Sequence, residues 1–381
     1  MPANTGRRLF VFSVFLFWFS HYVYLPTLPE YLLSKTGSLT RVGTVLAMFG
    51  LWQAIVRFPL GRLVDLVGRR KLFILCGTAL AGFGALALWW AAGYGGLIAA
   101  RSVLGVSMST WVLQVVVFSA FFPPEQTVRA GAILTLVSSL AKLLGTSLTG
   151  FLNSLGGYAL SFYVAGSSVA LAVLMLLPLS DPAPVTATRS PGVVFSLLRK
   201  KTVVIPSALA IVNQFINFSV TFGFLPILAG QLGANDVLKS LLVATNIVAL
   251  IFGNLLVTTF AKKANPVHLL VVSFSLFTVG VAGTALALGL GWLFPLQGLL
   301  GLAHGIGYPT TIGLTIREVE QSRRATAMGL HQTIYAVGMF AGPGLSGLLA
   351  ELAGIRFTFV VIAAGCLVSS SVLIWRLTRN K

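Results

Sequence analysis

The chain has 381 residues, of which 56% are hydrophobic and 9% are charged, and its formal net charge is +18. A soluble domain carries roughly 25% charged residues, and a chain this apolar cannot hide its hydrocarbon in one aqueous core. The basic excess could indicate nucleic-acid binding. However, the Lys and Arg residues sit in short clusters between long apolar runs, the pattern that orients membrane proteins. Composition therefore predicts an all-α membrane protein with no nucleic-acid partner.

Apolar runs of about 20 residues, the length that crosses a bilayer as a helix, recur twelve times along the chain. Glycine, proline and basic clusters separate them. The first run follows Arg7 and Arg8 but lacks the small-residue cleavage site of a signal peptide, so we treat it as a transmembrane helix. The predicted spans are 9–31, 42–61, 71–92, 94–121, 129–152, 158–179, 203–229, 237–260, 267–289, 291–316, 326–350 and 356–376.

The basic residues predict the orientation of these spans. With the N-terminus inside, nineteen Lys and Arg residues fall in cytoplasmic segments and four in external ones. This asymmetry obeys the positive-inside rule. We therefore expect a multi-pass protein of the plasma (inner) membrane with both termini in the cytoplasm.

The longest polar stretch divides the spans into two groups of six. Residues 1–180 are the predicted N-terminal half, 181–202 a cytoplasmic linker and 203–381 the C-terminal half. Within the linker, an apolar segment at 193–198 precedes three basic residues and predicts a short interfacial helix on anionic lipid. Two similar halves suit alternating access, with a substrate site between them near the bilayer midplane.

The segment after the second span carries a family signature. It reads Gly-Arg-Leu-Val-Asp-Leu-Val-Gly-Arg-Arg-Lys over residues 61–71, and it resembles the G-x-L-x-D-x-x-G-R-K/R motif of the major facilitator superfamily. The resemblance implies a twelve-helix fold of two pseudo-symmetric halves and a conformational latch on the cytoplasmic side. Orientation alone would explain the basic residues but requires neither the acid nor the glycines. The predicted latch residues are Gly61, Asp65, Gly68, Arg69 and Arg70.

A second segment strengthens the resemblance. Arg101 lies inside the fourth span with Gly105 four residues later, which is similar to a superfamily motif whose arginine is linked to proton transfer in proton-coupled members. The chain resembles the drug:proton antiporter branch most. It departs from that branch in the fifth span, where the Gly-Pro step of the antiporter motif is absent, and a Gly-Pro step occurs instead at residues 342–343.

Three basic residues lie within the predicted spans, where charge is costly and therefore suggests function. Arg57 is about one turn from a helix end, so we expect it to snorkel. Lys142 lies near the middle of its span among small and polar residues, which predicts a cavity wall; the alternative is a lysine paired with a carbonyl or a distant acid. No carboxylate falls at the midplane, so the central field is expected to be positive and to favour anionic groups.

Buried amides, aromatic residues and histidines supply the remaining candidates. Amides interleaved with aromatics fit a wall for an amphipathic solute, and histidine titrates near neutral pH; packing and interhelical hydrogen bonding are the alternatives. The predicted substrate-binding residues are Lys142, Arg101, His21, Tyr24, Asn213, Asn217, His304 and Tyr335. The predicted proton-coupling residues are Arg101, His21, Glu30 and His331.

These features predict a secondary transporter that moves a small anionic, zwitterionic or amphipathic organic solute by proton-coupled alternating access, most consistent with efflux. The alternatives are an uptake symporter or facilitator for an organic anion and, from another class, a non-transporting receptor or assembly protein. Nucleotide-binding, zinc-protease and serine-hydrolase motifs are absent, so no enzyme is predicted. Neither Cys76 nor Cys366 has metal-ligand spacing, and we expect no cofactor or metal. The expected partners are the solute, protons and membrane lipids, and the expected state is a monomer.

Overall fold

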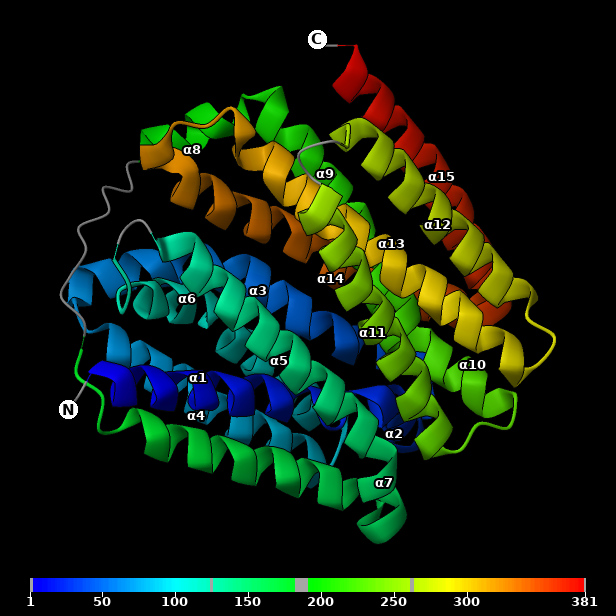
Figure 1. Cartoon of the computed structure of the whole chain (residues 1–381). Coiled ribbons are helices and arrows are strands. Elements are labelled where there is room, and N and C mark those ends of the chain that lie inside the picture. The colour runs from blue at the N-terminus through cyan, green and yellow to red at the C-terminus, as the bar shows by residue number, and fades with distance from the viewer. Residues whose placement is uncertain (1–2, 124–125, 182–190, 261–263, 380–381) are drawn as a thin grey trace.

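The computed structural model describes residues 3–123, 126–181, 191–260 and 264–379, and in these ranges it is a bundle of helices with short connections (Figure 1). We call residues 3–181 the first half and residues 191–379 the second half. The first half contains α1 (Ala3–Tyr22), α2 (Leu28–Thr36), α3 (Leu39–Val67), α4 (Arg70–Trp90), α5 (Tyr94–Ser109), α6 (Trp111–Ser119) and α7 (Thr127–Leu176). The second half contains α8 (Pro191–Leu198), α9 (Lys201–Ile216), α10 (Leu225–Gln231), α11 (Asp236–Phe260), α12 (Pro266–Leu286), α13 (Leu290–Arg317), α14 (Arg324–Ala353) and α15 (Ile355–Thr378).

Several of these helices combine into single membrane crossings. The short turn Leu25–Thr27 joins α1 to α2, α5 continues into α6, and the π-helical segment Asn217–Phe224 joins α9 to α10. In contrast, α7 contains a turn at Gly156 and Gly157. Gly157 has a φ of +62°, a left-handed conformation that glycine adopts without a steric cost. The two parts of α7 run antiparallel from this turn (Figure 1).

The number of crossings agrees with the sequence. Ten helical stretches in the described ranges are long and apolar enough to cross a membrane, and the whole of α7 counts once among them. The second passage of α7 and the helix α13, whose glycines and polar residues dilute its hydropathy, bring the total to twelve. The prediction of an all-α protein with twelve transmembrane helices is confirmed. Helices satisfy their own backbone hydrogen bonds, as a hydrocarbon solvent requires.

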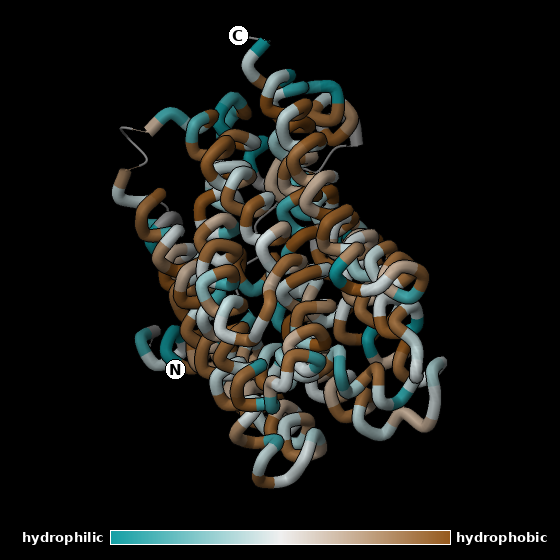
Figure 2. The backbone as a smooth tube through the Cα atoms, turned by 90° about the vertical axis from the view of Figure 1, so that its right-hand side faces the viewer, coloured by the Kyte–Doolittle hydropathy of each residue, from teal (hydrophilic) through white to brown (hydrophobic). Residues whose placement is uncertain are grey.

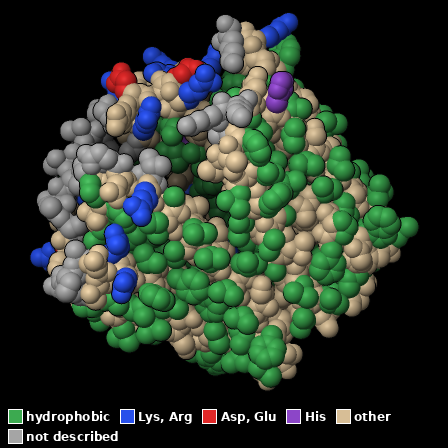
Figure 3. All heavy atoms as spheres, viewed as in Figure 1, with side chains coloured by type: hydrophobic (Ala, Val, Ile, Leu, Met, Phe, Trp, Pro, Cys, Tyr) green, Lys and Arg blue, Asp and Glu red, His purple; other side chains and the backbone are tan. Residues whose placement is uncertain are grey.

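The surface is apolar along the helices and differs in charge between the two ends of the bundle. Hydrophobic residues run along most of the helices (Figure 2), and large apolar side chains cover most of the visible face (Figure 3). Lys and Arg side chains gather at one end in Figure 3, around a hollow between the two halves. We call this the basic end: it is where α3 meets α4 and where α13 meets α14. The opposite end, where α2 leads into α3 and α10 leads into α11, is the far end.

Two seams hold the halves together, one between α3 and α14 and the other between α7 and α11. In the first seam, Gly43 and Gly347 face one another so closely that a Cβ on either residue would overlap the other. In the second, a Cβ on Gly150 would overlap the backbone of Asp236 and Val237. Small residues let helix backbones approach closely where lipid supplies no hydrophobic driving force.

Candidate substrate cavity and its closure

A cavity of about 340 Å³ lies between the two halves. The first half contributes residues from α1, α3, α5, α6 and α7, and the second half contributes residues from α9, the π-helical segment, α13 and α14. Among the residues that the structure describes, no carboxylate lines it. The polar and charged residues that line it are Gln53, Arg57, Thr135, Ser138, Lys142, Gln214, Asn217, His304 and Gln332, together with the aromatic residues Trp18, Tyr22, Phe49, Trp111, Phe218, Tyr308 and Tyr335.

Lys142 faces this cavity from α7. Its Nζ lies 4.0 Å from the centre of the Trp18 ring and 5.5 Å from that of Tyr22. Aromatic faces attract cations, and within the described ranges no carboxylate lies within ion-pairing distance of this ammonium group. Ser138 and Thr135, one and two turns earlier in α7, line the same wall. The polar stripe around Lys142 therefore borders the cavity over these turns.

The expectation that Arg57 snorkels towards a helix end is wrong. Its side chain is 7% exposed and lines the cavity. Nη2 donates to Gln53 Oε1 at 2.6 Å, while Nη1 donates to Tyr335 Oη at 3.1 Å and to the Gln332 carbonyl oxygen at 3.2 Å. Arg57 and Gln53 belong to α3, whereas the two residues that accept from Nη1 belong to α14, so this guanidinium bridges the two halves. Distance from the helix end misled the sequence analysis, although Gln53 one turn earlier in α3 was a signal of a polar face.

Three further predicted residues also line the cavity. Asn217 does so from the π-helical segment, a backbone irregularity that is frequent at functional sites. His304 stacks on Tyr308 with ring centres 5.6 Å apart. Tyr335 accepts from Arg57 and lies edge-on to Tyr308. The cavity therefore brings together four of the eight predicted substrate-binding residues, counting Lys142.

The other four lie outside its lining. Arg101 is 2% exposed, and its Cζ lies 4.4 Å from the centre of the Phe49 ring. Because Phe49 itself lines the cavity, Arg101 sits one layer behind the wall. Asn213 is fully buried against α13, where a Cβ on Gly307 would approach its Nδ2 to 3.0 Å. Periodicity placed these residues inside the bundle but could not separate the first layer from the second.

His21 and Tyr24 belong to the same second layer. His21 Nδ1 lies 2.9 Å from the Phe17 carbonyl oxygen, and its ring packs on the Phe17 ring. Tyr24 packs on Phe162 with ring centres 5.0 Å apart. Both side chains are nearly completely buried.

His331 is fully buried within the second half. Its Nδ1 lies 3.0 Å from Ser207 Oγ and 3.0 Å from Thr315 Oγ1. Each hydroxyl also lies within hydrogen-bonding distance of a backbone carbonyl one turn earlier. This arrangement joins α9, α13 and α14.

The far end is closed by charged groups that cross between the halves. Lys239 on α11 donates to Glu30 on α2 and, at 3.2 Å, to Asp236 on its own helix. Asp236 Oδ2 also accepts from Asn153 Nδ2 at 2.8 Å, and the same nitrogen donates to Thr27 Oγ1 at 3.0 Å. Lys239 is 4% exposed, so this cluster is largely shielded from water on its cationic side.

A second contact closes the other seam at the same end. Glu351, near the end of α14, accepts from the start of α3: from Ser38 Oγ and from the backbone N–H of Thr40, each at 3.2 Å, and from the N–H of Leu39. A carboxylate is favourable at this position because the first N–H groups of a helix have no intrahelical acceptor.

The signature segment has a mainly local arrangement. Gly68 ends α3 with a φ of +70°, and Gly61 is buried inside α3. Lys71 donates from its backbone N–H to Asp181 Oδ1 at 3.1 Å and from Nζ to the Leu177 carbonyl oxygen, both in the same half. Arg69 is exposed and Arg70 is buried. The side chain of Asp65 lies outside the described part of the structure, so the latch stays a prediction.

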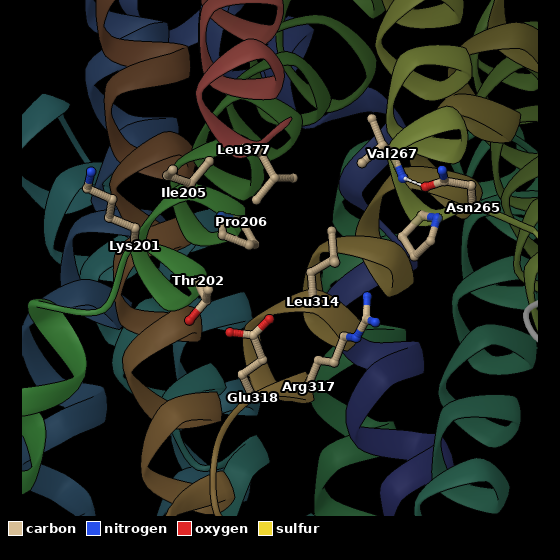
Figure 4. A pocket seen from close by; sticks show the side chains of 11 residues that line it. Lys201, Thr202, Ile205, Pro206, Asn265, Val267, Leu314, Arg317, Glu318 and Leu377 are labelled. Carbon is tan, nitrogen blue, oxygen red and sulfur yellow. Dashed lines mark hydrogen bonds between the residues drawn. The ribbon is translucent and has the colours of Figure 1, made fainter. Parts of the chain in front are cut away.

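A smaller cavity of about 110 Å³ lies in the second half at the basic end (Figure 4). Lys201 and Thr202 at the start of α9 border it together with Arg317 and Glu318 at the end of α13. Because an acid accompanies the bases, this cavity has mixed charge, in contrast to the larger one.

Comparison with known proteins identifies the family. A 22% identical relative, covering 90% of this chain and 92% of its own length, is an uncharacterized MFS-type transporter of Methanocaldococcus jannaschii. A multi-drug resistance efflux pump PmrA homolog of Lactococcus lactis is 29% identical over 39% of this chain and 37% of its own length. Among solved structures, a bacterial homolog of the human lysosomal transporter Spinster, inward-facing and unoccupied, superposes with a TM-score of 0.81 at 14% identity, covering 98% of this chain and 97% of that one. The family model for the Major Facilitator Superfamily matches residues 10–215 and 207–381, and the chain therefore belongs to the Major Facilitator Superfamily.

Proposed function

We propose that this transporter moves a small organic solute with an anionic group, either an organic anion, a zwitterion or an acidic amphipath, by proton-coupled alternating access. One observation carries the proposal: Lys142 and Arg57 place two positive charges in a cavity between the halves, and no carboxylate is among the described residues that line it. A fixed positive field raises the local concentration of anions and repels cations. The aromatic walls supply the apolar surface that typical ligand pockets combine with a few polar groups.

The distribution of Lys and Arg supports an orientation with the basic end in the cytoplasm. Charged side chains close the far end, and the hollow lies at the basic end. The positive-inside rule assigns the basic end to the cytoplasm. The similarity to an inward-facing structure supports this assignment. The basic end, both termini and the linker are then cytoplasmic in a plasma (inner) membrane. The helix α8 lies at that surface, where Arg199 rests on the Phe195 ring at 4.4 Å.

Proton coupling is assigned to the far-end cluster. When Glu30 takes up a proton from outside, its attraction to Lys239 weakens and the far end is freed to open. His331, His21 and Arg101 are second-layer candidates for the same role. The similarity of part of the chain to an efflux pump homolog supports export in exchange for protons.

Flux in proteoliposomes tests the proposal. Purified protein is reconstituted, a pH gradient is imposed in either direction, and uptake of radiolabelled aromatic and aliphatic acids is compared with that of matched amines. Acids are expected to move in the direction opposite to the proton flux. Lys142→Met is expected to reduce the initial rate of this movement at least about tenfold. Exclusive movement of amines would refute the proposal.

The same measurement separates the alternatives. An exporter loads everted vesicles when protons leave the lumen, whereas an uptake symporter loads right-side-out vesicles when protons enter. A receptor or assembly protein on this fold shows no solute-dependent flux in either orientation.

A further inference from the structure

The strongest unexplained feature of the cavity is the set of hydrogen-bond donors left over on Arg57. A guanidinium has five N–H donors. Arg57 uses both hydrogens of Nη1, for Tyr335 and the Gln332 carbonyl, and one of Nη2, for Gln53. Nε has no acceptor in the described ranges although the side chain is buried. Two N–H groups therefore remain, one on Nε and one on Nη2. Nε has almost no accessible surface in this conformation, so a ligand reaches it only after a covering side chain moves.

The leftover donors match one chemical group. Nε and Nη2 share an edge of the guanidinium plane. When Gln53 accepts the Nη2 hydrogen on the Nη1 side, the two parallel N–H groups left at this edge form the fork that binds the two oxygens of a carboxylate. An unsatisfied buried donor is costly, so a ligand that supplies an acceptor at this edge gains free energy. The other bonds of Arg57 hold the guanidinium in place before the ligand arrives, which reduces the ordering cost of binding.

The surroundings of Arg57 define the remainder of the ligand. Trp18 lies edge-on to Trp111 with ring centres 5.0 Å apart, and Trp18 Nε1 is a second buried donor without an acceptor. Met108 and Met339 add soft apolar surface to the same lining. The cavity therefore combines donors with apolar and aromatic area, and the positive charges of Arg57 and Lys142 disfavour an ammonium group there.

We propose that Arg57 is the residue that selects the substrate, and that it does so by binding the carboxylate of an amphipathic monocarboxylic acid whose apolar body lies against the aromatic wall. This inference rests on the proposed transport of an anionic solute and adds the group that is recognised. Arg57, rather than Arg101 behind Phe49, is then the arginine that binds the anionic group. Lys142 contributes to the positive field and stays on the Trp18 ring.

Because of the position of Arg57, binding of an acid also affects the contact between the two halves. The residue belongs to α3, but two of its acceptors are on α14, so it touches both halves at the cavity. A carboxylate bound at its free edge adds to these inter-half bonds without displacing them. An acid is therefore expected to stabilise the assembled cavity, whereas a neutral ligand of the same shape is not.

Binding to the purified full-length chain in nanodiscs tests the inference. Isothermal titration compares 2-naphthoate, 2-naphthamide and 2-naphthylmethylamine, which share one ring body, and 4-phenylbutyrate and decanoate serve as acids with other bodies. The variants are Arg57→Gln and Arg57→Lys. Arg199→Gln is the matched control, because Arg199 also rests on an aromatic ring but follows the last residue of α8, outside the cavity.

The readout is the ratio of the amide and acid dissociation constants within one preparation, which does not depend on the fraction of protein that is folded. We expect the acid to bind at least about tenfold tighter than the amide in the native chain and in Arg199→Gln. Arg57→Gln should bring the ratio to about one, and Arg57→Lys should leave an intermediate ratio because lysine keeps the charge but lacks the fork.

Three results would overturn the inference: the native chain binds none of the acids, it prefers the amide or the amine, or Arg57→Gln retains the full preference for acid. Each is a binding result and is distinct from failure of the proposed function, which is the absence of proton-driven flux of any acid in proteoliposomes. Flux that persists in Arg57→Gln with its selectivity for acids unchanged would refute the role of Arg57 alone.

Discussion

The far-end cluster offers the most direct test of alternating access in this protein. Lys239 on α11 lies between Glu30 on α2 and Asp236 on its own helix, so one ammonium group faces two carboxylates. Glu30→Gln removes one negative charge and leaves the ion pair of Lys239 and Asp236, whose net charge is zero. Lys239→Met keeps most of the side-chain length but leaves two carboxylates facing each other. The two substitutions should therefore open the far end to different extents.

The size of each effect follows from burial and charge. A pair of unit charges 4 Å apart is worth about 4 kcal/mol at an effective dielectric constant of about 20. Glu30 is 33% exposed, so water screens part of this energy, and we expect Glu30→Gln to weaken the closed state by about 1–2 kcal/mol. Lys239 is 4% exposed, and removing the shared partner of a buried pair costs about 3–5 kcal/mol. The ratio of closed to open molecules should fall about tenfold in the first variant and at least about a hundredfold in the second.

Distances between two spin labels measure this ratio. Ser34 on α2 and Gln231 on α10 are exposed at the far end of opposite halves and take the labels after Cys76→Ser and Cys366→Ala. Both variants should move the population towards longer distances, with Lys239→Met showing the larger shift.

The control for this experiment is Glu320→Gln. Glu320 pairs with Arg323 three residues away, within one half and with both side chains exposed, so its loss should leave the distances unchanged. If neither far-end variant alters the distance distribution, or if Glu30→Gln has the larger effect, the ion cluster does not control closure.

Three more changes have defined outcomes. Gly150→Leu should lengthen the same label distance, because its side chain would overlap the α11 backbone, while Gly131→Ala, which meets nothing within 4 Å, should not. Ser207→Ala should remove one hydroxyl from His331 and lower the unfolding free energy by about 1 kcal/mol in a thermal melt, with no change in solute affinity. Glu351→Gln should shift the label distance in the same direction as Lys239→Met but less, because exposed backbone donors can bind water instead.

The fold could be predicted almost completely because a bilayer imposes simple rules. Apolar length fixes the number of crossings, and the turn at Gly157 falls in the gap between two predicted spans. The family membership agrees with the signature at residues 61–71, and the protein is a transporter rather than an enzyme. The prediction did not divide these spans into α1 and α2, α5 and α6, or α9 and α10, although Pro26 and Pro29 mark the first of these breaks in the sequence.

The site was harder to predict, since a helical period gives the direction of a side chain but not the layer it reaches. Lys142 was recognisable because its neighbours along α7 are small and polar. Arg57 was missed because its depth was judged from its own helix, while its acceptors lie on α14, far away in sequence. Arg101 was placed in the cavity because nothing in the sequence reveals that Phe49 covers it.

The placement of the acidic residues separates closure from binding: closure uses the far end, and binding uses the cavity between the halves. The chain has eight Asp and Glu residues. The three at the far end, Glu30, Asp236 and Glu351, each accept from a donor in the opposite half. When the halves separate, water can replace the partners in such bonds. An apolar contact of equal strength would instead expose apolar surface to water, which is unfavourable. None of the acids whose side chains the structure describes lines the cavity, so Lys142 and Arg57 keep their charge available there. A carboxylate placed in the cavity wall, such as Gln53→Glu beside Arg57, should therefore act as a tethered substitute for the solute and abolish acid binding while leaving the fold intact.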